Sequence, residues 1–369
     1  MAPLEPWEKV LVKTEFLTSV HGKTSCISCH NGKQSPEKEI AHTGLVRNPT
    51  ENPEKFCGGC HQKQTQNIKS SLHFSLQGYW TVLNVRSMPE NKKPLETMFG
   101  NHCSKCHTTC ADCHISQPNS VEGGFLDGHL FVKTPPMTRT CTGCHGSRVG
   151  NEYLGKNHVA PNSDEMYPGD VHFRVARMNC VSCHQGASLH DSGGATHRLY
   201  RPQNPKCENC HPKVGAAGDT VPQHALHKDK VSCQVCHSIT YTSCDACHVS
   251  ISPKTNQPVF RTEGTYMTFL IGKNPLKSPE RPYNYVPVRH IPVAPNQFEY
   301  YGKNLLPNFN KLPTWAYATP HNIQRITPQS ESCNNCHGET KIFLTKDKVK
   351  PEELEANKPV IVEKVPTKK

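Results

Sequence analysis

The chain has 369 residues, of which only 34% are hydrophobic, and it contains 31 prolines and 24 glycines. Side chains alone are therefore not expected to bury enough surface for the two or three ordinary domains that this length suggests. The formal net charge is +11 at pH 7, with 20 cysteines and 23 histidines. No run of about 18 apolar residues occurs, so no membrane-spanning helix is predicted.

Every cysteine belongs to a C-x-x-C-H unit, and ten such units occur along the chain. Two thiols at this spacing can bond to the vinyl groups of one porphyrin while the adjacent imidazole binds its iron, which is the attachment pattern of c-type haem. Zinc knuckles also use C-x-x-C pairs, but they do not require histidine at the next position. Ten covalently bound haems are thus predicted, and no cysteine remains for a disulfide, a catalytic thiol or a separate metal site.

The haem-bonding cysteines and the histidines that follow them are defined directly by these units. The predicted cysteines are Cys26, Cys29, Cys57, Cys60, Cys103, Cys106, Cys110, Cys113, Cys141, Cys144, Cys180, Cys183, Cys207, Cys210, Cys233, Cys236, Cys244, Cys247, Cys333 and Cys336. The predicted iron ligands within the units are His30, His61, His107, His114, His145, His184, His211, His237, His248 and His337.

The spacing of the units divides the chain into segments. Residues 1–101 form an N-terminal segment with two haems, and residues 102–248 form a densely packed core with seven. Within this core only two residues separate His107 from Cys110, and six separate His237 from Cys244, so neighbouring haems are expected to touch. Residues 333–344 hold the last haem.

The interval 249–332 has no unit but contains 12 of the 31 prolines, together with many aromatic residues. Proline disfavours helix and aromatic rings pack on porphyrin, so an extended arm that wraps over haem edges is predicted. A substrate pocket with a catalytic tyrosine is the alternative. Residues 345–369 form a charged tail, of which residues 358–366 are expected to dock on a neighbouring subunit by backbone pairing.

The predicted fold is mostly irregular, with short α-helices and little β-structure, and is organised around a chain of ten covalently bound haems. Proline and glycine interrupt almost every interval, so helices should be short and begin or end at the C-x-x-C-H units. Since the porphyrins supply the core, the haem-free chain is not expected to fold.

Thirteen histidines lie outside the units, whereas ten irons need at most ten further ligands. This supply favours a second imidazole on every iron. Such an iron has no position open to a small substrate and lacks the methionine ligand that raises the reduction potential, so electron transfer rather than catalysis is expected. The candidate second ligands are His21, His42, His73, His102, His129, His172, His190, His224, His227, His290 and His321, with His158 and His197 the weakest of the thirteen.

Haem propionates would pair with many of the lysine and arginine side chains, so a nucleic-acid partner is not expected. The N-terminus lacks a basic region followed by an apolar run, which is the pattern of a signal peptide. Because covalent haem attachment takes place after export, the chain is expected to be the mature form of an exported protein that is periplasmic, extracellular or bound to the cell surface.

With these units in place, the sequence resembles the multihaem c-type cytochromes of bacterial and archaeal respiration, including extracellular electron conduits and filament-forming extracellular cytochromes. The stretches Cys141–Arg148, Asp170–Phe173 and Cys233–Ser238 also resemble multihaem cytochromes that share a core with octahaem reductases. The C-x-x-C-K unit of pentahaem nitrite reductases is absent, and the disulfide cysteines of outer-surface decahaem cytochromes have no counterpart.

The resemblance implies an electron carrier, not an enzyme, that exchanges electrons with redox partner proteins or extracellular acceptors. Self-association into an oligomer or a filament is a further hypothesis that it suggests. The alternative function is an oxidoreductase that acts on a small nitrogen or sulfur compound at one open haem.

Overall fold

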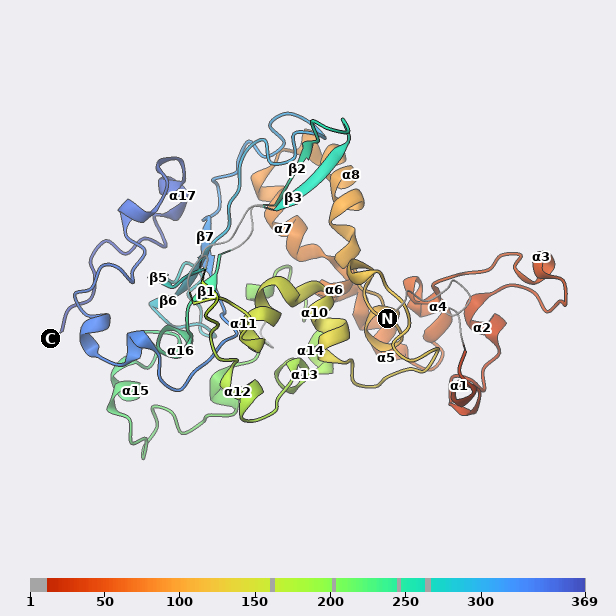
Figure 1. Ribbon diagram of the computed structural model, residues 1–369, viewed down its shortest axis with the longest axis horizontal. Coiled ribbons are helices and arrows are strands. Elements are labelled where there is room, and N and C mark those ends of the chain that lie inside the picture. The colour runs from red at the N-terminus through yellow and green to blue at the C-terminus, as the bar shows by residue number, and fades with distance from the viewer. Residues whose placement is uncertain (1–11, 160–162, 201–203, 244–246, 263–266, 369) are drawn as a thin grey trace. The chain divides into compact units, whose positions relative to one another are not determined.

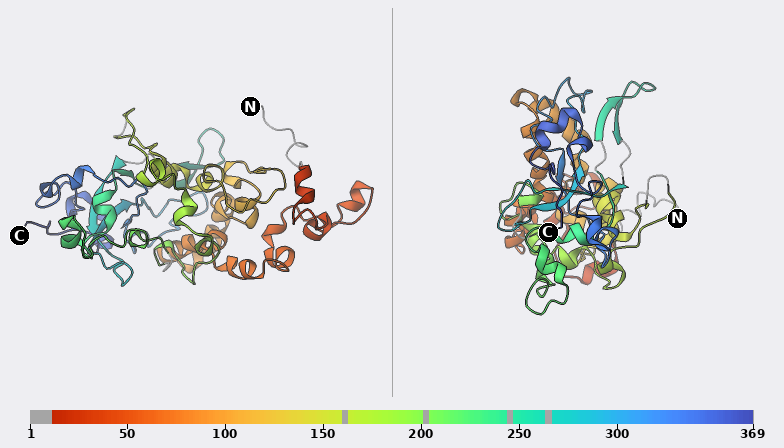
Figure 2. Two further views of the ribbon diagram at one scale, coloured as in Figure 1. Left: turned by 90° about the horizontal axis from the view of Figure 1, so that it is seen from below. Right: turned by 90° about the vertical axis from the view of Figure 1, so that its left-hand side faces the viewer.

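The computed structural model describes residues 12–159, 163–200, 204–243, 247–262 and 267–368, and Figure 1 shows short helices joined by irregular chain. Two further views also show short helices separated by irregular chain (Figure 2). The longest helix of this described part, α8, has 11 residues, and no described helix is long and apolar enough to cross a bilayer. The mostly irregular fold with little β-structure that the sequence predicts is therefore confirmed.

The helices are α1 (Thr14–Thr18), α2 (Cys26–His30), α3 (Lys38–Ala41), α4 (Pro53–Cys57), α5 (Gln62–Asn67), α6 (Leu72–Ser75), α7 (Gln77–Arg86), α8 (Lys92–His102), α9 (Cys110–His114), α10 (Thr142–His145), α11 (Asn151–Leu154), α12 (Val171–Arg174), α13 (Cys180–Cys183), α14 (Gly186–His190), α15 (Pro222–His227), α16 (Cys233–His237) and α17 (Leu354–Asn357). The strands are β1 (Tyr241–Thr242), β2 (Cys247–Ile251), β3 (Pro258–Thr262), β4 (Met267–Thr268), β5 (Leu270–Lys273), β6 (Tyr285–His290) and β7 (Trp315–Tyr317).

Several C-x-x-C-H units form one helical turn, as predicted. Helices α2, α9 and α16 each run from the first cysteine of a unit to its histidine. Polar residues before the units cap two of these turns: for α2 the Ser25 side chain accepts a hydrogen bond from the Ser28 amide, and for α9 Thr109 and Asp112 form a capping box. The caps satisfy backbone amides that have no partner within so short a helix.

The chain forms two compact units, which are described separately. Unit 1 comprises Met1–Gly78, Cys103–Gly146 and Asn179–Gln203, and unit 2 comprises Tyr79–His102, Ser147–Met178 and Asn204–Lys369. Each unit combines stretches that lie far apart in the sequence. In unit 2, for example, Arg86 of α7 donates a hydrogen bond to the carbonyl of Pro313 at 3.2 Å.

Unit 1 buries few apolar side chains. Among its described residues, the buried hydrophobic side chains are Ile68, Leu76, Ile115, Leu126 and Leu199. So small a set does not make an ordinary hydrophobic core for a unit of this length. The six C-x-x-C-H units that lie in unit 1 are therefore expected to supply the missing core through their haems.

Unit 2 has an apolar core built around a small sheet. Strands β5, β6 and β7 form an antiparallel sheet in the order β5-β6-β7, with Leu270 opposite Val288 and Val288 opposite Tyr317. Strand β1 pairs with β4, and β2 pairs with β3, both in antiparallel fashion. Most of these strands lie in the interval 249–332, which therefore carries sheet structure in addition to the extended chain predicted for it.

The C-terminal tail packs on its own unit. Val360, Ile361 and Val362 are buried, and the Lys273 amide of β5 donates to the Val360 carbonyl at 2.8 Å. Val362 joins a buried cluster that includes Ile271. The expected docking of residues 358–366 on a neighbouring subunit therefore finds no support in these contacts, because the segment already fills part of the core of unit 2.

Candidate haem-binding sites

Seven pairs of histidine rings lie at almost the same separation, with ring centroids 6.0–6.1 Å apart. In every pair one histidine belongs to a C-x-x-C-H unit and the other lies outside the units. The pairs in unit 1 are His21–His61, His30–His129, His73–His145 and His114–His190. The pairs in unit 2 are His172–His211, His224–His237 and His227–His337.

This separation fits one iron between the two rings. Half of it equals a metal–imidazole bond of about 2 Å plus the radius of an imidazole ring. Rings packed directly on each other would lie closer, as do those of His21 and Phe131, whose centroids are 3.9 Å apart. Each site thus offers two imidazoles to bind the iron and two thiols to bond to the porphyrin edge, which is the arrangement that a covalently attached haem requires.

Hydrogen bonds orient many of the paired rings through the nitrogen Nδ1. His30 donates from Nδ1 to the Val46 carbonyl at 2.8 Å, and His114 donates to the Val132 carbonyl at 2.7 Å. His227 donates in the same way to the Gln223 carbonyl at 2.9 Å. An Nδ1 atom that holds its proton leaves the lone pair of Nε2 for a metal, which is the usual arrangement of iron-binding histidines.

Two of the paired histidines donate to carboxylates instead. His172 Nδ1 lies 3.0 Å from Asp170 Oδ1, and His224 Nδ1 lies 2.8 Å from Asp219 Oδ2. Backbone amides of Gly215 and Val221 lower the pKa of Asp219 to about 2, with His224 contributing further. A carboxylate at this position makes the imidazole a stronger donor to its metal.

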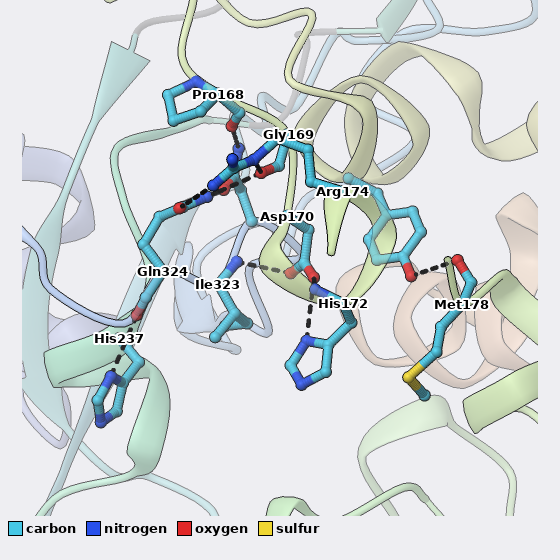
Figure 3. Close-up of polar contacts among 11 residues, drawn as sticks. Pro168, Gly169, Asp170, His172, Arg174, Met178, His237, Ile323 and Gln324 are labelled. Atoms are coloured by element: carbon cyan, nitrogen blue, oxygen red, sulfur yellow. Dashed lines mark hydrogen bonds and ion pairs between the residues drawn. The ribbon is translucent and has the colours of Figure 1, made fainter. Parts of the chain in front are cut away.

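Figure 3 shows how one network positions two candidate ligands of different irons in unit 2. The buried Asp170 carboxylate accepts the Nδ1 proton of His172 through Oδ1 and the Ile323 amide proton through Oδ2, at 2.6 Å for the latter. The carbonyl of Gln324, the residue after Ile323, accepts a hydrogen bond from His237 Nδ1 at 3.2 Å. Asp170 therefore connects the orientation of His172 with that of His237.

We expect the substitution Asp170→Asn to raise the reduction potential of the iron bound by His172. The neutral amide cannot accept all the bonds of the carboxylate, so the imidazole becomes a weaker donor and the ferric state loses stability. A tenfold change in relative stability corresponds to about 60 mV for one electron. Spectroelectrochemical titration of the haem-loaded protein should show one centre shifted upwards by an amount of that order.

The matched control is Asp347→Asn, which removes the charge of an exposed aspartate of unit 2. This control should change no haem reduction potential by more than the error of the titration. An unchanged or lowered potential in Asp170→Asn would contradict the role assigned to this carboxylate.

Other predicted second ligands have different surroundings. His290 Nε2 donates to the Glu353 carboxylate at 3.0–3.2 Å, so the nitrogen that would bind iron is occupied in this structure. His102 Nε2 lies 2.8 Å from the Tyr301 hydroxyl. His42 is exposed at the end of α3, and the backbone amide of His321 donates to the buried Glu152 carboxylate at 2.9 Å.

Three histidines of the C-x-x-C-H units complete the predicted set. His107 contacts Phe74, with ring centroids 5.0 Å apart. His184 directly follows α13, and His248 lies in β2. No sequence signal identifies the partner of each unit, because the paired histidines are separated by 13 to 110 residues.

The described cysteines are all free thiols, whereas Cys244 lies outside the described residues. Burial raises the pKa of the Cys113 thiol to about 12 and those of Cys57 and Cys336 to about 11. Thiols with such high pKa values are poor nucleophiles at neutral pH. Their positions beside the paired histidines suit them to covalent attachment of a porphyrin.

The chain is similar to the high-molecular-weight cytochrome c of Nitratidesulfovibrio vulgaris (strain Hildenborough), with 24% identity over 196 residues. The match covers 47% of this chain and 33% of the relative, so the chain spans about a third of the length of the curated relative it matches. No family model matches the chain, and no solved structure matches it. This similarity to a cytochrome c agrees with the haem-attachment units of the sequence.

Proposed function

We propose that the chain is an exported multihaem electron-transfer protein that holds ten c-type haems, at least seven of them between two histidines. The observation that carries this proposal is the set of seven histidine pairs at 6.0–6.1 Å, each with one member from a C-x-x-C-H unit. The similarity to a cytochrome c supports the same conclusion.

Haem iron bound in these sites supplies one-electron oxidation and reduction. At the seven paired sites, the chain's own contribution is to hold the iron from both faces, which keeps small molecules away from the metal. Carbonyl and carboxylate groups fix the ligand rings through Nδ1, so the ligand geometry needs to change little when an electron arrives or leaves. Redox partner proteins or extracellular acceptors would exchange electrons with such a chain, and a filament is one form in which it could be assembled.

Carbon monoxide tests the assignment of ligands, because it binds a ferrous haem only where an axial position is open. We expect His190→Gln to create one carbon monoxide-binding haem that the unchanged protein lacks, since His190 faces His114 across a site of the right width. The measurement is the change in the Soret band when the gas is added to the dithionite-reduced, fully haem-loaded protein.

The control is His290→Gln, which keeps an amide donor for Glu353 and removes only the imidazole. It should add no site for carbon monoxide, because His290 Nε2 is bonded to that carboxylate. The proposal fails if His190→Gln behaves like the unchanged protein, or if the unchanged protein binds the gas at most of its haems.

The second candidate function is reduction of a small nitrogen or sulfur compound at one open haem. One observation favours it: among the described residues, the ring contact of His107 is with Phe74, not with a second histidine. An iron bound by His107 would then have an axial position to offer. A carbon monoxide response in the unchanged protein that disappears on removal of the Cys103–His107 haem would support this candidate.

A further inference from the structure

Thiols of different C-x-x-C-H units meet inside unit 1. Each unit is named here by its first cysteine. Helix η5 (Ser104–Cys106) of the Cys103 unit and α10 of the Cys141 unit both pack against the turn η6 (Asn119–Val121), where Cys144 Sγ lies 3.2 Å from Ser120 Oγ. The thiols of Cys106 and Cys144 lie close enough there to interact. Since each thiol is the point where a porphyrin edge is attached, two thiols in contact bring two porphyrin edges together.

The other thiol of the Cys141 unit has a different neighbour. The Cys141 thiol lies close enough to the thiol of Cys180, in the Cys180 unit, for the two to interact. The backbone supports this contact, because α13, which begins at Cys180, packs against the π-helix η7 (Met137–Cys141). The Cys141 unit thus borders two other units, one beside each of its thiols.

A third unit borders the same place. Helix α9 of the Cys110 unit packs against η7, and Cys113 lies close enough to Cys141 for the two thiols to interact electrostatically. The sequence predicts that the haems of the Cys103 and Cys110 units are neighbours, because only two residues separate the units. In the structure, the Cys103 unit also places its thiol Cys106 beside Cys144.

The Cys57 and Cys26 haem-attachment units extend this row of neighbours beyond the Cys110 unit. The Thr50 hydroxyl donates to that of Thr109 at 2.7 Å, which joins the turn before the Cys57 unit to the start of the Cys110 unit. Helix α4, which ends at Cys57, packs in turn against α2 of the Cys26 unit. The contacts therefore follow the sequence Cys26, Cys57, Cys110, Cys141 and Cys180 units, with the Cys103 unit beside this line.

We propose that the haem route in unit 1 branches at the Cys141 unit, whose haem borders those of the Cys103, Cys110 and Cys180 units, with the Cys103 haem as a side branch. This inference rests on the proposed function. A line of sites has two ends, and a side branch adds a third at which electrons can enter or leave. The side branch is also the unit whose histidine, His107, contacts Phe74.

The test uses the substitution His73→Met in the fully haem-loaded protein. His73 faces His145 of the Cys141 unit, and a methionine ligand raises the reduction potential of its haem. That iron can then be reduced while its neighbours stay ferric. Loss of its spin should change the magnetically coupled signals of three neighbouring irons in electron paramagnetic resonance spectra.

The matched control is His129→Met. His129 faces His30 of the Cys26 unit, which borders one unit, so selective reduction there should change the signal of one iron. A change in about three times as many iron signals in His73→Met supports the branch. A change in equal numbers of iron signals in the two variants overturns it.

A density map of the haem-loaded protein separates this inference from the proposed function. The branch requires the porphyrin on Cys106 to lie closer to the porphyrin on Cys144 than to the one on Cys110. The reverse order overturns the branch even where all seven histidine pairs hold their irons. The expected order together with irons that lack the paired histidines would instead reject the proposed ligation and keep the branch.

Discussion

Without its haems, the chain is expected to lose stable structure throughout unit 1 while the sheet of unit 2 keeps part of its protection. Unit 1 buries five hydrophobic side chains among its described residues. Burial contributes roughly 1.5 to 3 kcal/mol per large side chain, whereas ordering the backbone costs roughly 1 to 2 kcal/mol per residue. The apolar contacts of unit 1 therefore cannot hold it together alone.

Unit 2 differs because its core contains a sheet whose apolar side chains bury one another. Val286 and Val288 of β6 are fully buried, as is Leu344, and Val360 covers the neighbouring strand β5. This core refines the prediction from composition that no part of the haem-free chain folds. Without haem, only unit 1 is expected to lose its folded structure completely.

Hydrogen–deuterium exchange of the chain produced without haem attachment provides the measurement. Peptides from residues 12–78 should exchange at the rate of an unfolded chain, and peptides covering β5 and β6 should exchange more slowly. The haem-loaded protein is the reference, in which both sets should be protected. Protection of α2, α4 and α5 in the haem-free chain would contradict the dependence of unit 1 on its haems.

The local parts of the fold could be predicted from the sequence because they follow from short-range rules. A C-x-x-C-H unit closes one turn, and Ser25 or Thr109 in front of it supplies the cap, so helices α2 and α9 begin at their first cysteine. Frequent proline and glycine predicted that such helices would stay short. The attachment chemistry of each haem was readable for the same reason.

The long-range parts could not be predicted, because they depend on which distant segments meet. His30 faces His129 across 99 residues, and nothing near either residue marks the other as its partner. In the sequence nothing distinguishes His290 from the other candidate ligands, whereas in the structure its Nε2 is hydrogen-bonded to Glu353. The composition of the charged tail predicted that residues 358–366 dock on a neighbouring subunit, whereas Val360, Ile361 and Val362 are buried in unit 2.

Replacing Glu152 with glutamine is expected to destabilise unit 2 by about 3 to 5 kcal/mol, the usual cost of breaking a buried ion pair. The Glu152 side chain is fully buried and contacts the Arg289 guanidinium. Its second oxygen accepts the His321 amide proton at 2.9 Å. Burial raises the pKa of Glu152, while Arg289 favours the charged form. The substitution leaves the Arg289 charge without its counter-ion.

Denaturant unfolding of the haem-loaded variants measures this effect, through the change in midpoint at constant slope. The control is Glu363→Gln, which breaks the exposed ion pair between Glu363 and Lys273, whose side chains are 81% and 40% accessible. Surface pairs contribute about 0 to 1 kcal/mol, so this variant should unfold almost like the unchanged protein. Equal midpoints for the two variants would contradict a structural role for the buried pair.

A double substitution separates the ion pair from the packing around it. Glu152→Leu combined with Arg289→Met removes both charges and keeps side chains of similar length, so no buried charge is left unpaired. We expect it to recover most of the stability lost in Glu152→Gln. Recovery would show that the single variant suffers mainly from the unpaired Arg289. A double variant as unstable as the single one would place the loss in the other contacts of these residues, which are the amide of His321 and the ring of Tyr241 beneath Arg289.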